Sequence, residues 1–173
     1  MGTAQNGASA TTVIGTCTDL RVKLLGADSI PGAATTAGIL VKVEVSSTAN
    51  CEYKGYPIAA AMLSSGLTRM ASDLRTDIFG GMPTGSEASA PLHSFVITSR
   101  ARTVSFTLSW FSGNGTACPL ISGLRFTLPG SRQSLVVHSI YEGGVGMTKF
   151  LGIYCGHLSV TPTVPGFTGK YGW

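Results

Sequence analysis

A run of alternating residues that ends before a cysteine constrains the fold of this chain more than any other feature. In the stretch from Gly38 to Pro57, the first strand-like part carries a branched apolar side chain at every second position: Ile39, Val41, Val43 and Val45. This period of two is typical of a β-strand with one buried face. Small polar residues follow, and then Cys51. The sequence therefore predicts a core strand with a covalent anchor just beyond its end.

Four cysteines are spread along the chain: Cys17, Cys51, Cys118 and Cys155. None is close enough to another for a C-x-x-C redox or zinc motif. An even set of isolated cysteines in a strand-rich chain indicates two disulfides and an oxidising compartment, with four buried free thiols as the alternative. Three connectivities are open. The local one, Cys17 with Cys51 and Cys118 with Cys155, closes two loops of similar size, and each bridge would stabilise the fold by about 3 to 4 kcal/mol.

Other short segments show the same alternation. The expected strands are Thr18 to Leu25, Ile58 to Leu63, Leu92 to Thr98, Thr103 to Phe111, Gly123 to Leu128, Leu135 to Ile140 and a last strand around Leu158 and Val160. Trp110, on the apolar face of its strand, is expected in the core. Residues 26 to 38 are interpreted as a long connection because Gly, Ala and Pro interrupt the pattern.

The segment 67–78 fits two structures. Its apolar residues lie three and four apart, which would make a helical stripe. The preceding Ser64-Ser65-Gly66 is also a good hairpin turn, after which Thr68 to Ala71 would pair back onto the previous strand. We favour the hairpin.

About eight short strands without a dependable helix predict an all-β fold, an antiparallel β-sandwich in preference to a barrel. The 173 residues suit one domain. We assign 1–15 to a flexible lead-in or tether, 16–166 to the single domain and 167–173 to a loose tail.

Charge and hydropathy exclude several classes of protein. The net charge of +4 comes from scattered Lys and Arg residues, so no cluster suits the phosphates of a nucleic acid. The apolar runs are too short to span a membrane. The first residues lack the charged and apolar regions of a signal peptide, which leaves a cytosolic protein or a mature secreted domain. The cysteines favour the secreted domain.

The motif C-x-x-x-G-Y-P, from Cys51 to Pro57, is one of several features that follow one another in a recognisable order. The others are Trp110 shortly before Cys118, the sequence Leu-Pro-Gly at 128–130, and Cys155-Gly156 before a strand that ends in Thr-Pro. From residue 17 to residue 166 the chain resembles an actinobacterial family of secreted and lipid-anchored proteins, classed as a domain of unknown function.

The resemblance implies an immunoglobulin-like β-sandwich at the cell envelope of organisms such as mycobacteria, with the two local disulfides. It implies no activity. The chain departs from the family in having Ser46-Ser47-Thr48 where Asn commonly follows the strand, and it carries no lipobox cysteine. The composition of residues 2–15 would suit a tether to a lipid anchor.

No motif predicts catalysis, a metal or a cofactor. The histidines, His93, His138 and His157, are far apart and outside any H-x-x-x-H setting. No G-x-S-x-G motif is present. Asp73 and Asp77 are the nearest pair of acids that could serve glycoside hydrolysis, and both are expected in solvent. We predict no catalytic, cofactor-binding or metal-binding residues.

A rigid sandwich that carries loops is suited to binding. Ile78, Phe79 and Met82 form a candidate interaction loop, because large apolar side chains in a Gly-rich segment either contact a partner or plug the core, and the plug is favoured. The leading hypothesis is a non-enzymatic, exported envelope module that binds an unknown envelope protein or ligand. The alternatives are an envelope hydrolase with a spatially assembled site and a carrier of a small apolar ligand.

Overall fold

The described part of the protein is built from strands. A computed structural model describes residues 14–30, 35–73, 94–113, 117–143, 145–149 and 151–166. These residues form fourteen strands and no helix. The strands are β1 (Arg21–Ile30), β2 (Thr36–Ser46), β3 (Cys51–Tyr53), β4 (Ile58–Leu63), β5 (Thr68–Met70), β6 (Ser72–Asp73), β7 (Phe95–Ile97), β8 (Arg102–Phe111), β9 (Ile121–Thr127), β10 (Ser134–Val137), β11 (Ile140–Glu142), β12 (Gly146–Thr148), β13 (Gly156–Val160) and β14 (Val164–Pro165). The all-β prediction is confirmed. The expected number of about eight strands was too low, because strands of two to four residues, too short for a period-two signal, border the longer ones.

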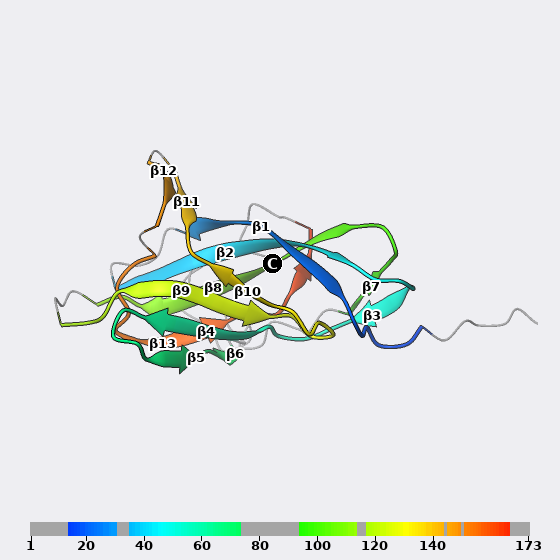
Figure 1. Cartoon of the computed structure of the whole chain (residues 1–173), viewed down its shortest axis with the longest axis horizontal. Coiled ribbons are helices and arrows are strands. Elements are labelled where there is room, and N and C mark those ends of the chain that lie inside the picture. Colours follow the sequence, from blue (N-terminus) through cyan, green and yellow to red (C-terminus); the bar gives the residue numbers. More distant parts are fainter. Residues whose placement is uncertain are drawn as a thin grey trace, which may run out of the picture.

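The strands form a large sheet, a small sheet and a separate pair. The eight-stranded sheet has the order β12-β11-β1-β2-β8-β13-β6, with β14 also paired to β8. The four-stranded sheet has the order β10-β9-β4-β5, and β3 pairs with β7. Figure 1 shows the four-stranded sheet in front of the large sheet, and the β11–β12 hairpin at one end. The pairing is antiparallel except for β1 with β11 and β13 with β6, which are parallel.

The core lies between the two larger sheets. The alternating apolar side chains of β2 are fully buried, as predicted, and so are Phe106, Leu108 and Trp110 of β8. Phe106 meets Phe126 of β9 edge to face, with ring centroids 5.0 Å apart. This contact joins the sheets at a distance suited to an aromatic pair. The architecture is therefore sandwich-like.

The second face of β8 is also buried. Ser105, Thr107 and Ser109 alternate with the apolar residues and are closed off from solvent. The Ser105 hydroxyl donates to the Gly166 carbonyl at 2.9 Å, and the Thr107 amide donates to Thr161 Oγ1 at 2.9 Å. The buried hydroxyls of Thr107 and Ser109, in contrast, have no hydrogen-bond partner among the described residues.

The predicted connection over residues 26–38 was wrong in extent. β1 continues to Ile30 and β2 already begins at Thr36, with the register shifting between Leu24 and Gly26. Lys42 and Asp28, one on each strand, form an ion pair with 2.6 Å between Nζ and Oδ2. Pairing with β2 thus keeps this stretch in the sheet although its own residues favour turns.

The hairpin after Ser64 is confirmed and the helix alternative is wrong for the described residues. β5 pairs antiparallel with β4, with Met70 opposite Ala60. The Leu63 amide donates to the Leu67 carbonyl at 2.9 Å and closes the turn. Residues 74–93 lie outside the described ranges.

Both local disulfides are present. Cys17 is bonded to Cys51, with Cα atoms 4.8 Å apart, and Cys118 to Cys155, with Cα atoms 5.2 Å apart. The first bridge fixes the residues before β1 to the start of β3. The second fixes the segment after β8 to the segment before β13. No described cysteine is free, and two disulfides indicate an oxidising environment.

Candidate binding face of the four-stranded sheet

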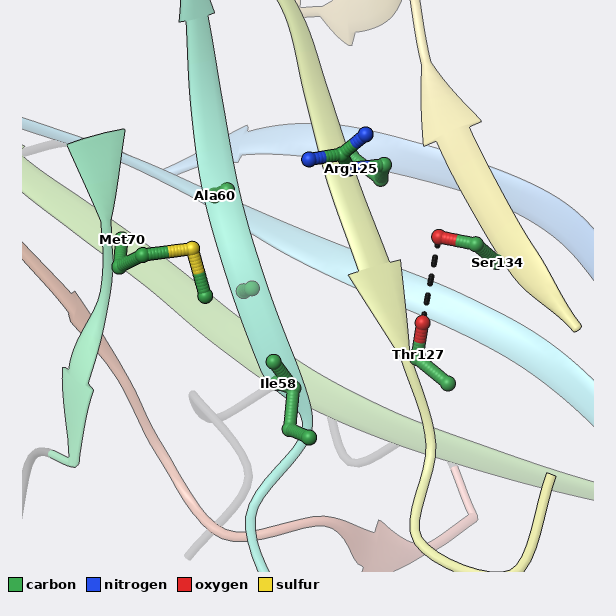
Figure 2. A pocket seen from close by; sticks show the side chains of 7 residues that line it. Ile58, Ala60, Met70, Arg125, Thr127 and Ser134 are labelled. Atoms are coloured by element: carbon green, nitrogen blue, oxygen red, sulfur yellow. Dashed lines mark hydrogen bonds between the residues drawn. The ribbon is translucent and has the colours of Figure 1, made fainter. Parts of the chain in front are cut away.

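The four-stranded sheet has one face in the core and one toward solvent. Its inward side chains, among them Ala61, Leu124 and Phe126, belong to the core. We call the opposite side the outer face and define it by the residues labelled in Figure 2: Ile58, Ala60, Met70, Arg125, Thr127 and Ser134. These six residues come from all four strands of the sheet.

The register places the outer-face residues in two rows. Met70 of β5, Ala60 of β4 and Arg125 of β9 are directly opposite one another. Beside them lies the row of Ile58, Thr127 and Ser134. Ala60 is small and buried, so the face is hollowed at its position, and the depression has a volume of about 310 Å³. Figure 2 shows Met70 and Ile58 near Ala60, and Arg125 on the neighbouring strand.

Two large apolar side chains at this depression are exposed. Ile58 is 66% exposed and Met70 is 61% exposed. The solvent face of an antiparallel sheet is normally polar, which makes two such side chains beside a depression a feature that needs explanation.

The polar groups of the outer face are a guanidinium and two hydroxyls. Thr127 Oγ1 donates to Ser134 Oγ at 3.2 Å. Arg125 is exposed and makes no ion pair or hydrogen bond among the described residues. Strands β4, β5, β9 and β10 contain no Asp or Glu, so Arg125 has no acid on its own sheet.

Gly123 shapes the neighbouring part of the same side of the sheet. A Cβ at this position would lie 2.5 Å from the Met62 methyl carbon and 3.1 Å from Val136 Cγ1. The missing side chain therefore lets Met62 reach across β9 toward β10. This packing extends the apolar surface beyond the depression.

A second group of exposed apolar side chains lies on the β11–β12 hairpin. Tyr141 and Met147 are cross-strand partners, and Met147 is 65% exposed. Val145, between the two strands of the hairpin, is exposed as well. Convergent polar groups beside a hollow distinguish a binding site from an exposed apolar patch. The outer face has both features, and we therefore rank it above the hairpin.

The sequence-predicted residues have different positions in the fold. The four cysteines form the two structural bridges and do not line the outer face. The candidate loop residues Ile78, Phe79 and Met82, as well as His93, lie outside the described ranges.

The two described histidines, His138 and His157, lie on different strands or segments of the fold. His138 is exposed, and its Nδ1 lies 3.4 Å from the backbone oxygen of Ser122. Among the described residues, no hydrogen bond joins a histidine to a hydroxyl or thiol side chain, and no group of three His, Cys, Asp or Glu side chains is placed to hold a metal.

Tyr53 is the described residue with a strongly shifted pKa. Burial raises the pKa of its phenol far above the ordinary value, while the hydrogen bond to Thr163 acts in the opposite direction. The hydroxyl donates to Thr163 Oγ1 at 3.0 Å, and the ring contacts Phe95. Tyr53 is therefore a neutral core residue that holds β3 against the segment after β13.

Sequence reasoning missed the outer face. One signal was available: in β4, Ile58, Ala60 and Met62 are apolar on the side that alternates away from Ala59 and Ala61. A strand that is apolar on both sides is usually buried on both sides. Here one side is open, and only the structure distinguishes the two outcomes.

Comparisons with protein-family models, with curated proteins and with solved structures found no match to this chain. The resemblance to the actinobacterial family therefore stays a prediction. Within the described ranges, no helix has the length and apolar character required to cross a bilayer.

Proposed function

We propose that this protein is an exported, non-enzymatic binding module of the cell envelope and that it binds its partner through the outer face. The observation that carries the proposal is the pair of exposed apolar side chains, Ile58 and Met70, beside an open depression that also holds Arg125. Interfaces combine such apolar anchors with a few polar groups that fix orientation.

The location of the module is part of the proposal. Two disulfides support a compartment outside the cytoplasm. The C-x-x-x-G-Y-P motif supports the envelope of an actinobacterium and an immunoglobulin-like identity for the sandwich.

The two alternative functions receive less support. A hydrolase needs a nucleophile within about 3 Å of a base, and the contacts of the described residues supply no such pair with a histidine. A carrier needs an enclosed apolar pocket of roughly 300 Å³ or more. The depression on the outer face reaches that volume but is not enclosed.

Site-specific photo-crosslinking in the envelope of the source organism tests the proposal. A benzophenone amino acid is placed at position 70 or, as a matched control, at position 147, because both methionines are similarly exposed. We expect one discrete protein adduct from position 70, competed by added wild-type protein and not by Met70→Ser. An adduct from position 147 alone would show that the hairpin, and not the outer face, is the binding surface.

A further inference from the structure

We infer that the partner of the outer face is an acidic protein segment in which a large apolar side chain lies beside one or more carboxylates. This inference rests on the proposed function of that face. It assigns a chemical class to the partner from three features of the described residues: the shape of the depression, the arginine within it and the two hydroxyls beside it.

The shape of the depression suits one apolar side chain of the partner. Ala60 forms its floor, while Ile58 and Met70 supply apolar surface at its rim. A volume of about 310 Å³ holds a Leu or Phe side chain with room for part of its backbone. Side chains that fill such pockets near the centre of an interface carry much of its binding energy.

The charge next to the depression selects an acid. Two other cations of the described surface are paired with nearby acids: Lys42 Nζ lies 2.6 Å from Asp28, and Arg132 Nε lies 3.0 Å from Asp19. Arg125 makes no ion pair among the described residues, and the four strands of its sheet contain no acid. A guanidinium can form a bidentate pair with a carboxylate, which fixes the orientation of the partner and strengthens binding.

A protein segment fits these features better than a lipid surface does. Membrane-binding surfaces present protruding apolar side chains with several cations around them. The outer face instead places its exposed Ile58 and Met70 around a depression, and Arg125 is the single cation among the residues that line it. The hydroxyls of Thr127 and Ser134 are hydrogen-bonded to each other and can also form hydrogen bonds with a peptide backbone.

Selection from a random peptide library displayed on phage tests the inference, with the disulfide-bonded protein immobilised. We expect enriched peptides to place Asp or Glu within two positions of a Leu, Ile, Phe or Trp. Synthetic copies should bind Arg125→Gln at least about tenfold more weakly than wild type, the loss expected for a charge-assisted pair. The matched control Arg21→Gln, an exposed arginine on β1 of the other sheet, should bind within about twofold.

The outcomes separate this inference from the proposed function. If Met70→Ser abolishes peptide binding but the peptides are not acidic and Arg125→Gln binds them normally, the acidic partner is refuted and the binding face stands. If the selected peptides bind Met70→Ser as well as wild type, both proposals fail. Binding to phosphatidylglycerol vesicles that is lost in Arg125→Gln, with no peptide enriched, would replace the protein partner with an anionic lipid.

Discussion

Replacing Trp110 by alanine should be one of the most destabilising single changes in this protein. The side chain is 1% exposed on the central strand β8, and its indole Nε1 donates to the Ile153 carbonyl at 3.1 Å. The segment 151–153 lies so close to the ring that a Cβ on Gly152 would be 3.5 Å from Cζ2 of the indole. The large buried volume and the lost hydrogen bond therefore act together.

Emptying a large aromatic site in a core costs about 3 to 5 kcal/mol. Loss of the partner of a half-buried carbonyl adds about 1 kcal/mol. We expect Trp110→Ala to lower the free energy of unfolding by roughly 4 to 6 kcal/mol from these two terms. Trp110→Phe, which keeps most of the volume and loses the N–H donor, should cost about 1 to 2 kcal/mol.

Urea unfolding followed by far-ultraviolet circular dichroism, with the disulfides intact, measures these losses. The slope against urea should stay unchanged while the midpoint falls. Tyr141→Ala, an aromatic truncation on an exposed side chain, is the control and should cost less than about 0.5 kcal/mol. A loss below about 1 kcal/mol for Trp110→Ala would refute the placement of the ring in the core.

Four further predictions concern single features of the fold. Gly130→Ala should lower the free energy of unfolding in urea by more than about 1 kcal/mol, because φ is +76° and the added Cβ would lie 2.5 Å from the Cys17 carbonyl oxygen. The control Gly143→Ala, with open space around it, should leave stability unchanged. Equal effects of the two substitutions would contradict this geometry. Cys118→Ala with Cys155→Ala should cost roughly 3 to 4 kcal/mol, and an unchanged melting temperature would count against a structural role for that bridge. Stability should fall as the pH rises above about 10, because the unfolded chain loses the Tyr53 proton that the folded protein retains. The stability of Tyr53→Phe should depend less on alkaline pH. An identical pH profile for the two proteins would argue against a buried, neutral Tyr53. The double variant His138→Gln with His157→Gln should keep both the fold and partner binding. Loss of binding with an intact fold would show that a histidine takes part in the function.

The sequence predicted the central strands well because their signal is local. In β2 and β8 the apolar residues recur at every second position, and a fully buried face requires that pattern. The hairpin of β4 and β5 was predictable for the same reason, since its turn is formed by adjacent residues. The disulfide pairing was left open by spacing and was indicated by the family resemblance.

The remaining features depend on contacts between residues far apart in the chain. The continuation of β1 to Ile30 comes from pairing with β2, and the burial of Ser105 and Thr107 comes from the segments around β13 and β14. Neither is visible in a local window of sequence. The outer face joins Ile58, Met70 and Arg125 only when β4, β5 and β9 form one sheet, so no motif could have predicted it.

Methyl NMR of protein labelled with ¹³C at the methionine ε-methyl groups tests the binding face most directly. The chain contains five methionines. Met70 is on the outer face, Met62 packs beside it near Gly123, and Met147 is on the β11–β12 hairpin as an internal control. On titration with unlabelled envelope extract, we predict that the Met70 signal shifts or broadens while the Met147 signal stays in place. A shift of Met147 with an unchanged Met70 would contradict the assignment of the outer face as the binding surface.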